Sequence, residues 1–213
     1  MNKLTVALPK GRMFDPSVEM LRKVDLVNRE LDDDSRKLVL KDPQAPIEFI
    51  LAKPVDVPTY VEHGVADIGI SGKDILLEAE AKIAEVLDLK MSSCRLVVAL
   101  PEEKGITSLS EVPPTTRVAS KYVNVTKKFF NQQGIQVEVV KLNGSIELAP
   151  LIGLSDMIVD ISSTGRTLRE NNLIEIAEIA KSSARLVVNK VSYKSNYKLI
   201  KEVTGKLKQL IVD

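Results

Sequence analysis

The stretch from Asp156 to Asn171, DMIVDISSTGRTLREN, joins an apolar run to a dense series of hydroxyl side chains, one glycine and two arginines. If DMIVDI is a strand and TLREN opens a helix, the SSTGRT turn between them lies where backbone N–H groups and the helix dipole converge. Such a turn binds phosphate. Glycine lets the backbone approach the ligand closely, and the hydroxyls add donors. The residues expected to form this site are Ser162, Ser163, Thr164, Gly165, Arg166 and Thr167.

Asp160 ends the expected strand just before the SSTGRT turn. A carboxylate repels phosphate, so we expect Asp160 to act a few ångströms away, on the hydroxyls of a sugar that carries the phosphate. The pattern therefore indicates a sugar-phosphate ligand. The alternative is that the serines and threonines only cap the helix and that Asp160 caps a turn; spacing alone does not decide between the two.

The elements that must position these residues alternate between apolar, β-rich runs and helix-patterned segments. Several strand candidates are apolar on successive residues, which favours strands covered on both faces and a mainly parallel sheet. The pattern predicts an α/β architecture. The expected strands are 4–9, 37–40, 47–52, 66–71, 95–100, 117–120, 136–142, 156–162 and 185–188, and the expected helices lie within 16–24, 57–64, 73–82, 125–134, 145–154 and 167–171.

Several helix ends are marked in the sequence. Gly64 and Gly134 stand where helix C-caps belong, and Pro58 suits a first helical turn. Residues 193–213 are expected to form one amphipathic closing helix with a basic outer face. Its apolar stripe consists of Leu199, Ile200, Val203, Leu207, Leu210 and Ile211.

An internal echo bears on domain organisation. SSCRLVVAL (Ser92 to Leu100) recurs as SSARLVVNK (Ser182 to Lys190). Two similar strands passing in opposite senses between lobes predict a discontinuous first domain, residues 1–92 and 187–213, and a second domain, residues 93–186. The alternative is chance similarity between two buried strands that begin with arginine.

Composition excludes several classes of protein. Lysine and arginine total 30 against 29 acidic residues, so a net charge of +1 gives no electrostatic reason to expect nucleic acid or an anionic membrane. No apolar run is long enough to span a bilayer or to form a signal-peptide core, and we expect a cytoplasmic protein. A single cysteine, Cys94, and a single histidine, His63, exclude an intrachain disulfide and a cysteine/histidine zinc site. Cys94 is expected in a buried strand, and His63 at a helix end.

The segment ELAPLIGLSDMIVDISSTGRTLRENNL (Glu147 to Leu173) resembles the phosphoribosyl pyrophosphate (PRPP) signature of the ATP phosphoribosyltransferase family, the first enzyme of histidine biosynthesis. Three further segments agree with the same family: LPKGR (8–12), DVPTYVEHGVADIGISGKDIL (56–76) and GSIELAP (144–150). The resemblance covers essentially the whole chain in the same order. Two positions depart from the family pattern: Lys53, where an arginine is expected, and Val123, where a proline is expected after Lys121 and Tyr122.

The resemblance implies two α/β lobes like those of type II periplasmic binding proteins, with the active site in the cleft. It assigns the 5-phosphate of PRPP to residues 162–167 and the ribose hydroxyls to Asp160. It assigns the pyrophosphate or ATP to Lys10, Gly11 and Arg12, then to Arg36, Gly72 and Lys73, with Gly69 and Asp74 shaping the same side. For Lys10 and Arg12 the alternative is ordinary solvated loop charge. Asp67 is expected to cap the start of a strand rather than to bind a ligand.

The implied chemistry is attack by adenine N1 of ATP on the anomeric carbon of PRPP. Adenine N1 already has a lone pair, so no general base is needed, and Mg²⁺ carried with the phosphates of ATP and PRPP assists the leaving group. No metal-binding residue is identified. Because the chain ends at Asp213, directly after its closing helix, we expect the short form of the family. That form implies a homodimer within a hetero-octamer, with a regulatory subunit resembling histidyl-tRNA synthetase.

Two other functions are compatible with these features. One is a non-catalytic solute-binding module of the same two-lobed fold. The other is a phosphoribosyltransferase with a different acceptor, because a turn of acid, hydroxyls and glycine serves several acceptors. LPKGR and GVADIGISGKD favour the ATP enzyme.

Overall fold

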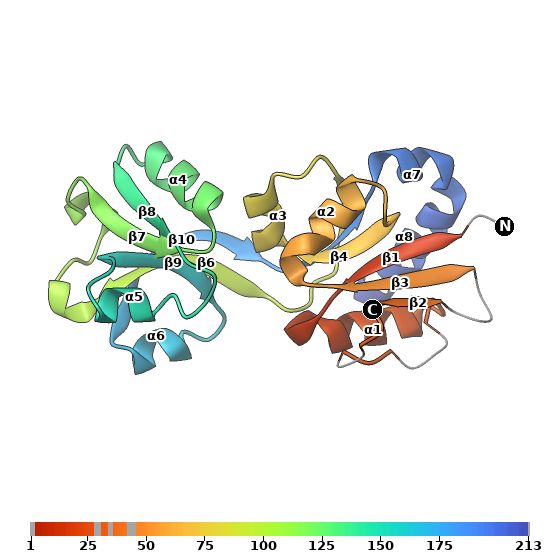
Figure 1. The fold of residues 1–213 in the computed structure, drawn as a ribbon, viewed down its shortest axis with the longest axis horizontal. Coiled ribbons are helices and arrows are strands. Elements are labelled where there is room, and N and C mark those ends of the chain that lie inside the picture. Colours follow the sequence, from red (N-terminus) through yellow and green to blue (C-terminus); the bar gives the residue numbers. More distant parts are fainter. Residues whose placement is uncertain (1–2, 28–30, 34–35, 42–45, 213) are drawn as a thin grey trace. The chain divides into compact units, whose positions relative to one another are not determined.

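The computed structural model describes residues 3–27, 31–33, 36–41 and 46–212 (Figure 1). The chain divides into two compact units: the first comprises Met1–Ser92 and Ser183–Asp213, and the second Ser93–Ser182. Each boundary falls inside one of the two Ser-Ser pairs that begin the internal echo. The second boundary had been expected between Leu186 and Val187, but the strand Ala184–Val188 pairs along its whole length with a strand of the first unit.

The first unit is built on a six-stranded sheet of order β2-β3-β1-β4-β11-β5. Its strands β3, β1 and β4 are parallel, and the other pairs are antiparallel. The strands are β1 (Leu4–Pro9), β2 (Val39–Lys41), β3 (Ile47–Ala52), β4 (Ile68–Gly72), β5 (Ala84–Asp88) and β11 (Ala184–Val188). The helices are α1 (Phe14–Lys23), α2 (Val57–Glu62), α3 (Lys73–Ala79), α7 (Lys190–Ser195) and α8 (Tyr197–Val212), with 3-10 turns at Gly11–Met13 and Pro54–Asp56.

Alternation along β1 divides the core of the first unit into two layers. Leu4, Val6 and Leu8 pack with α1 and α8, whereas Ala7 packs with α2 on the other face (Figure 1). Helix α2 approaches β4 so closely that a Cβ at Gly69 would lie 2.8 Å from Val61. The carboxyl ends of β1 and β4 therefore stay side by side beneath a tightly packed helix.

The second unit has a five-stranded sheet of order β10-β6-β9-β7-β8, in which β9, β7 and β8 are parallel. Helices α5 and α6 cover one face through Ala149 and Leu168, and α4 packs beside β8. The strands are β6 (Cys94–Pro101), β7 (Thr116–Ser120), β8 (Val137–Lys141), β9 (Met157–Ser162) and β10 (Leu173–Ser182). The helices are α4 (Val123–Gln132), α5 (Leu148–Leu151) and α6 (Arg166–Glu170), with 3-10 turns at Glu102–Lys104 and Leu109–Glu111.

The α/β class and all nine expected strands are confirmed, but two details of the prediction are wrong. Both sheets are mixed rather than mainly parallel. Strands β5 and β10 had not been expected. The ladder between β10 and β6 shifts register twice, so the apolar residues of β10 do not alternate simply along the chain.

The closing segment also differs from the single helix that had been expected. It forms α7 and α8, which meet at Asn196. Asn189 begins α7 by accepting hydrogen bonds from the N–H groups of Val191 and Ser192. The predicted apolar stripe of α8 does enter the core, where Ile200, Val203 and Leu207 are buried.

The smaller predictions about individual positions are confirmed. Gly64 and Gly134 follow α2 and α4 with positive φ, and Pro58 lies in the first turn of α2. Cys94 is buried in β6. None of the helices in the described ranges has the length and apolar character that crossing a bilayer requires.

Candidate substrate site

The SSTGRT turn links the end of β9 to α6. Gly165 adopts the left-handed conformation, with φ +71°, at the start of α6. A Cβ there would lie 2.8 Å from the guanidinium of Arg169, which folds back and donates to the Thr164 carbonyl oxygen at 3.1 Å. Any residue other than glycine is therefore strained at this position. The side chains of Ser163, Thr164, Arg166 and Thr167 are exposed around the turn.

Ser162 has a different place from the other hydroxyl residues of the turn. It is only 5% exposed, and its Oγ donates to Glu175 Oε1 at 3.0 Å. Arg95 holds the same Glu175 carboxylate, with 2.7 Å between guanidinium nitrogen and oxygen. The Ser162 hydroxyl therefore anchors the turn to β10 through Glu175. The exposed hydroxyls of the turn are those of Ser163, Thr164 and Thr167.

Asp160 lies near the carboxyl end of β9 with a side chain that is 15% exposed. Its Oδ1 accepts a hydrogen bond from the Ile161 N–H at 2.8 Å and lies 3.5 Å from the ammonium of Lys121. Burial raises the pKa of Asp160, and the carboxylate of Glu147 adds to that rise, while Lys121 and the Ile161 N–H oppose it. A carboxyl group with a raised pKa beside an exposed hydroxyl turn is typical of a ligand site.

In the first unit, Lys10, Gly11 and Arg12 follow the end of β1. The Lys10 N–H donates to the Ala52 carbonyl oxygen at 2.8 Å. Gly11 has φ +79°, and its N–H donates to Asp33 Oδ2 at 2.8 Å. These bonds fix the backbone of the loop, while the side chain of Arg12 is exposed. The neighbouring parallel strand β4 ends at Gly72, so the two expected nucleotide-side segments lie at one edge of one sheet.

The other residues expected on the nucleotide side are Lys73, Asp74 and Arg36. The ammonium of Lys73 is paired with Glu85 on β5 at 2.6 Å. Asp74 folds back over Gly72, where a Cβ would lie 2.4 Å from its Oδ1. Arg36 is exposed and precedes β2.

Asp67 and His63 have the structural places that had been expected. The Asp67 carboxylate accepts hydrogen bonds from the Thr5 N–H at 2.8 Å and from the Ser192 hydroxyl at 2.6 Å, so it joins β1 to α7 at the start of β4. His63 ends α2, where its N–H donates to the Thr59 carbonyl oxygen. The prediction that Asp67 is a cap is confirmed.

Sequence reasoning gave no role to four residues that surround the SSTGRT turn and Asp160: Arg95, Lys121, Glu147 and Glu175. Lys121 and Glu147 had been quoted only as parts of family motifs. The first signal that could have found Lys121 is its position directly after a predicted strand, because the carboxyl ends of adjacent parallel strands meet at one edge. Glu175 gave no such signal, because β10 was not recognised.

Two compact units, each built on a mixed sheet with helices packed against it, define a two-unit α/β fold. The periplasmic aliphatic sulphonate binding protein SsuA from Escherichia coli is similar to this chain with a TM-score of 0.63 over 98% of this chain and 72% of that one. At 13% identity this likeness shows the fold alone.

The chain belongs to the ATP phosphoribosyltransferase family, whose model matches residues 53–209. It is 55% identical to the ATP phosphoribosyltransferase of Bacillus licheniformis, over 98% of this chain and 96% of the relative. It is 51% identical to that of Halothermothrix orenii, over 99% and 96%. The ATP phosphoribosyl transferase (HisG:HisZ) complex from Thermotoga maritima contains a chain 36% identical to this one, with a TM-score of 0.85 and 98% of both chains covered. The chain is thus a transferase.

Proposed function

We propose that the chain transfers the 5-phosphoribosyl group of PRPP to N1 of ATP, releasing pyrophosphate and forming N1-(5-phosphoribosyl)-ATP in the first step of histidine biosynthesis. Besides membership of the family, the observation that carries this proposal is the SSTGRT turn beside Asp160 in the second unit. The turn exposes hydroxyls around a left-handed glycine, and the largely buried Asp160 carboxylate lies near the end of β9, the strand that leads into the turn. A phosphate and a sugar joined to it match this pair.

The 5-phosphate of PRPP is assigned to the SSTGRT turn. Ser163, Thr164 and Thr167 offer hydroxyl donors, and Gly165 permits close approach of the backbone. Helix α6 has only five residues, so its dipole adds less than these direct hydrogen bonds. Ser162 contributes by holding the turn against Glu175, and Arg166, which pairs with Glu170 at 2.7 Å, adds positive charge at the rim.

Asp160 is assigned to the ribose hydroxyls. Donation from two hydroxyls favours the ionised carboxylate, so binding of the sugar lowers a pKa that burial raises in the free chain. Negative charge at this point also favours the positive charge that develops at the anomeric carbon as pyrophosphate departs. Asp160 therefore serves both orientation and transition-state stabilisation.

The pyrophosphate and ATP are assigned to the first unit. Lys10, Gly11 and Arg12 follow β1, whereas Gly72 ends β4 and Lys73 follows it, so cations and N–H groups gather at one sheet edge. Lys73 must leave Glu85 to meet a phosphate, and Arg36 is the more remote candidate. The guanidinium of Arg12 can bind a phosphate through paired donors.

Mg²⁺ enters this scheme with the substrates. Phosphate oxygens are its preferred ligands, and protein sites complete the shell with one or two carboxylates or with water. Among residues 3–27, 31–33, 36–41 and 46–212 there is no group of three or more histidine, cysteine or acidic side chains placed to hold a metal. When bound, the ion would neutralise charge on the phosphates, while the chain's own residues align the two polyanions so that adenine N1 faces the anomeric carbon.

We further propose that the chain works as the short, catalytic form of the family. The curated relatives match it over 96–99% of their own length, and the solved relative is described as a HisG:HisZ complex. By analogy, the chain would form a homodimer within a hetero-octamer with a regulatory subunit resembling histidyl-tRNA synthetase. Cytoplasmic location belongs to the same proposal.

The test is incubation of the purified chain, with and without that subunit, with PRPP, Mg²⁺ and either ATP or a free base, followed by mass detection. Phosphoribosyl-ATP is the expected product. Tight binding of PRPP without turnover in the complex would favour the solute-binding alternative, and transfer to another base would favour a different phosphoribosyltransferase.

A further inference from the structure

Lys121 and Asp160 occupy equivalent positions at the carboxyl ends of two adjacent parallel strands: Lys121 directly follows β7, and Asp160 lies near the end of β9. Strand β7 pairs with β9 so that Ser120 faces Val159, and Lys121 and Asp160 are the next residues along each chain. Their charged atoms are 3.5 Å apart. In open α/β sheets, ligands bind outside the carboxyl ends of such strands. The sequence assigns no role to Lys121.

The turn that carries Lys121 is locked to the strand that carries Asp160. The hydroxyl of Ser120 donates to the Val159 carbonyl oxygen at 2.7 Å and accepts from the Tyr122 N–H at 2.9 Å. The Thr126 hydroxyl then holds the Tyr122 carbonyl oxygen at 2.6 Å. Ser120, Tyr122 and Thr126 are at most 1% exposed. Buried hydrogen bonds therefore fix the backbone on both sides of the ion pair. An ordinary ion pair on the protein surface lacks such support.

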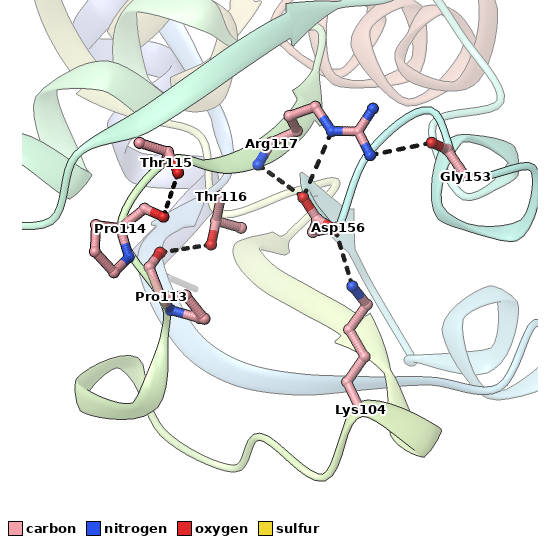
Figure 2. A network of polar contacts seen from close by, with 8 residues as sticks. All are labelled: Lys104, Pro113, Pro114, Thr115, Thr116, Arg117, Gly153 and Asp156. Carbon is pink, nitrogen blue, oxygen red and sulfur yellow. Dashed lines mark hydrogen bonds and ion pairs between the residues drawn. The ribbon is translucent and has the colours of Figure 1, made fainter.

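The opposite end of the same two strands offers a comparison (Figure 2). There the Asp156 carboxylate accepts a hydrogen bond from the Arg117 N–H at 3.0 Å and from the Lys104 ammonium at 3.0 Å, and Arg117 also donates to the Gly153 carbonyl oxygen. The hydrogen bond from the Arg117 N–H, together with Lys104, holds the pKa of Asp156 below its ordinary value. Asp156 is thus stabilised as an anion by the fold, whereas burial raises the pKa of Asp160 despite Lys121.

We propose that Lys121 is a positioning residue of the PRPP site: it keeps the Asp160 carboxylate ionised and aligned for the ribose hydroxyls. This inference rests on the function proposed for Asp160. The charged groups that face Asp160 are Lys121 from the β7–α4 turn and Glu147 from the start of α5, which act in opposite directions. On β6 the paired residue is the uncharged Val97. Lys121 therefore supplies a side-chain cation that opposes burial and Glu147 at Asp160.

Removal of the Lys121 ammonium should shift the pH dependence of the reaction, an effect that a simple loss of structure would not produce. In Lys121→Met the Asp160 carboxyl should bind its proton more tightly, because an opposite charge at this distance lowers a carboxyl pKa by about one unit or more. The acid limb of the pH profile of kcat/KM for PRPP should move upward by about one unit. At a pH below that limb, kcat/KM for PRPP should fall about tenfold, while KM for ATP changes little.

The experiment compares Lys121→Met, Lys121→Arg and Lys104→Met with the unaltered chain, all in the assembled enzyme. Lys121→Arg keeps the charge and should restore the acid limb. Lys104→Met removes the cation at the other end of the strands and should leave the limb unchanged. In parallel, ¹³C NMR of the isolated chains follows the Asp160 carboxyl, with Asp160→Asn used for assignment, so this arm needs no turnover.

A higher Asp160 pKa in Lys121→Met by NMR, with recovery in Lys121→Arg, would support the role of Lys121 even if the chain proved inactive, and inactivity would then count against the proposed function alone. An Asp160 titration that is the same in Lys121→Met as in the unaltered chain would overturn the inference. So would an equal shift in Lys104→Met, because the effect would then not belong to this pair.

Discussion

The Asp160 carboxylate is 15% exposed and faces one ammonium and one further carboxylate, those of Lys121 and Glu147. Its pKa in the folded chain is raised, so the folded state holds the proton more tightly than the unfolded state does. Stability therefore falls as the pH rises from the ordinary carboxyl range through the raised pKa, and at neutral pH the ionised group opposes folding. The ligand site is kept at some cost to the fold.

Replacement of Asp160 should accordingly stabilise the free chain. We expect Asp160→Asn to melt at a higher temperature than the unaltered chain at pH 7, and the difference to close at a pH below about 4, where the unfolded carboxyl is protonated. Thermal unfolding at several pH values measures this. Asp156→Asn is the matched control on the same strand and should melt lower at pH 7, because its lowered pKa stabilises the fold. A lower melting temperature for Asp160→Asn would contradict the assignment.

Thr167 and Ser162 test which hydroxyls of the SSTGRT turn meet the phosphate. Thr167→Ala removes an exposed hydroxyl and should weaken PRPP binding by about 1.5–3 kcal/mol, as for a hydrogen bond to a charged group, with a much smaller change for ATP. Ser162→Ala instead leaves Glu175 without one donor and should act mainly on stability. Calorimetry with each ligand measures both effects, and equal losses for PRPP and ATP in Thr167→Ala would refute the turn assignment.

Arg12 tests the first unit in the same way. Lysine keeps the charge but cannot reproduce paired guanidinium donors, so Arg12→Lys should lower kcat/KM by about tenfold or more. Arg22→Lys, an exposed change on α1, is the control and should be neutral. Near-normal kinetics for Arg12→Lys would return Arg12 to the class of solvated loop charges.

At the scale of elements, the two echo strands are alike in more than sequence. Arg95 on β6 pairs with Glu175 and Glu178 of the edge strand β10, and Arg185 on β11 pairs with Glu85 and Asp88 of the edge strand β5. Those edge strands are the two that the sequence did not predict. Acidic residues of both edge strands pair with these arginines. Along each edge strand, buried and exposed residues do not alternate with a period of two. These strands therefore form because a neighbouring strand pairs with them, and their own sequences show little preference for β structure.

Asp88 at the end of β5 gives the element-scale prediction. Burial alone raises its pKa, but hydrogen bonds from the Lys90 N–H and the Ser183 hydroxyl, with the charges of Lys90 and Arg185, lower that pKa to about 2. A lowered pKa contributes stability above the ordinary carboxyl range, and that contribution is lost as the pH falls through the folded pKa. Asp88→Asn should cost about 1–2 kcal/mol at pH 7 and almost nothing near pH 2, as measured by denaturant unfolding. A cost independent of pH would indicate lost packing instead.

Local sequence predicted the parts of the site that lie on one chain segment. The SSTGRT turn and Asp160 were indicated as candidates because a strand followed by small and hydroxyl residues has a local signature. The loop after β1 lacks that signature and was assigned only through the family resemblance. Lys121, Glu147 and Glu175 were missed as site residues because their proximity to the turn depends on which strands are neighbours. The division of the closing segment at Asn196 was missed because Tyr193 and Tyr197 fit helical spacing on either side of it.

At the scale of the whole molecule, the residues assigned to the two substrates belong to different units. Those assigned to the phosphate and ribose of PRPP lie in Ser93–Ser182, and those assigned to the pyrophosphate and ATP lie in the first unit. Both crossings between the units begin at a Ser-Ser pair that precedes an arginine-led strand. The echo thus coincides with the two points where the chain passes from one unit to the other.

The proposed assembly predicts where histidine acts. Feedback requires a site whose occupation differs between active and inactive states, and in the short form that site is assigned to the regulatory subunit. The isolated chain should therefore be insensitive to histidine and less active than the complex. Titration of histidine against the chain, with and without the subunit, measures this. Saturable inhibition of the chain alone would place the sensor within this polypeptide and contradict the assignment.

The central claim, that the Asp160 site performs phosphoribosyl transfer to ATP, is tested most directly by single-turnover formation of phosphoribosyl-ATP in the assembled enzyme, followed by mass spectrometry. We expect the unaltered chain to form the product, and Asp160→Asn to form it about 100-fold more slowly even at saturating PRPP, because the charge acts on the transition state as well as on binding. An Asp160→Asn enzyme with an unchanged single-turnover rate, or an unaltered complex that binds both substrates and forms no phosphoribosyl-ATP, would contradict the account.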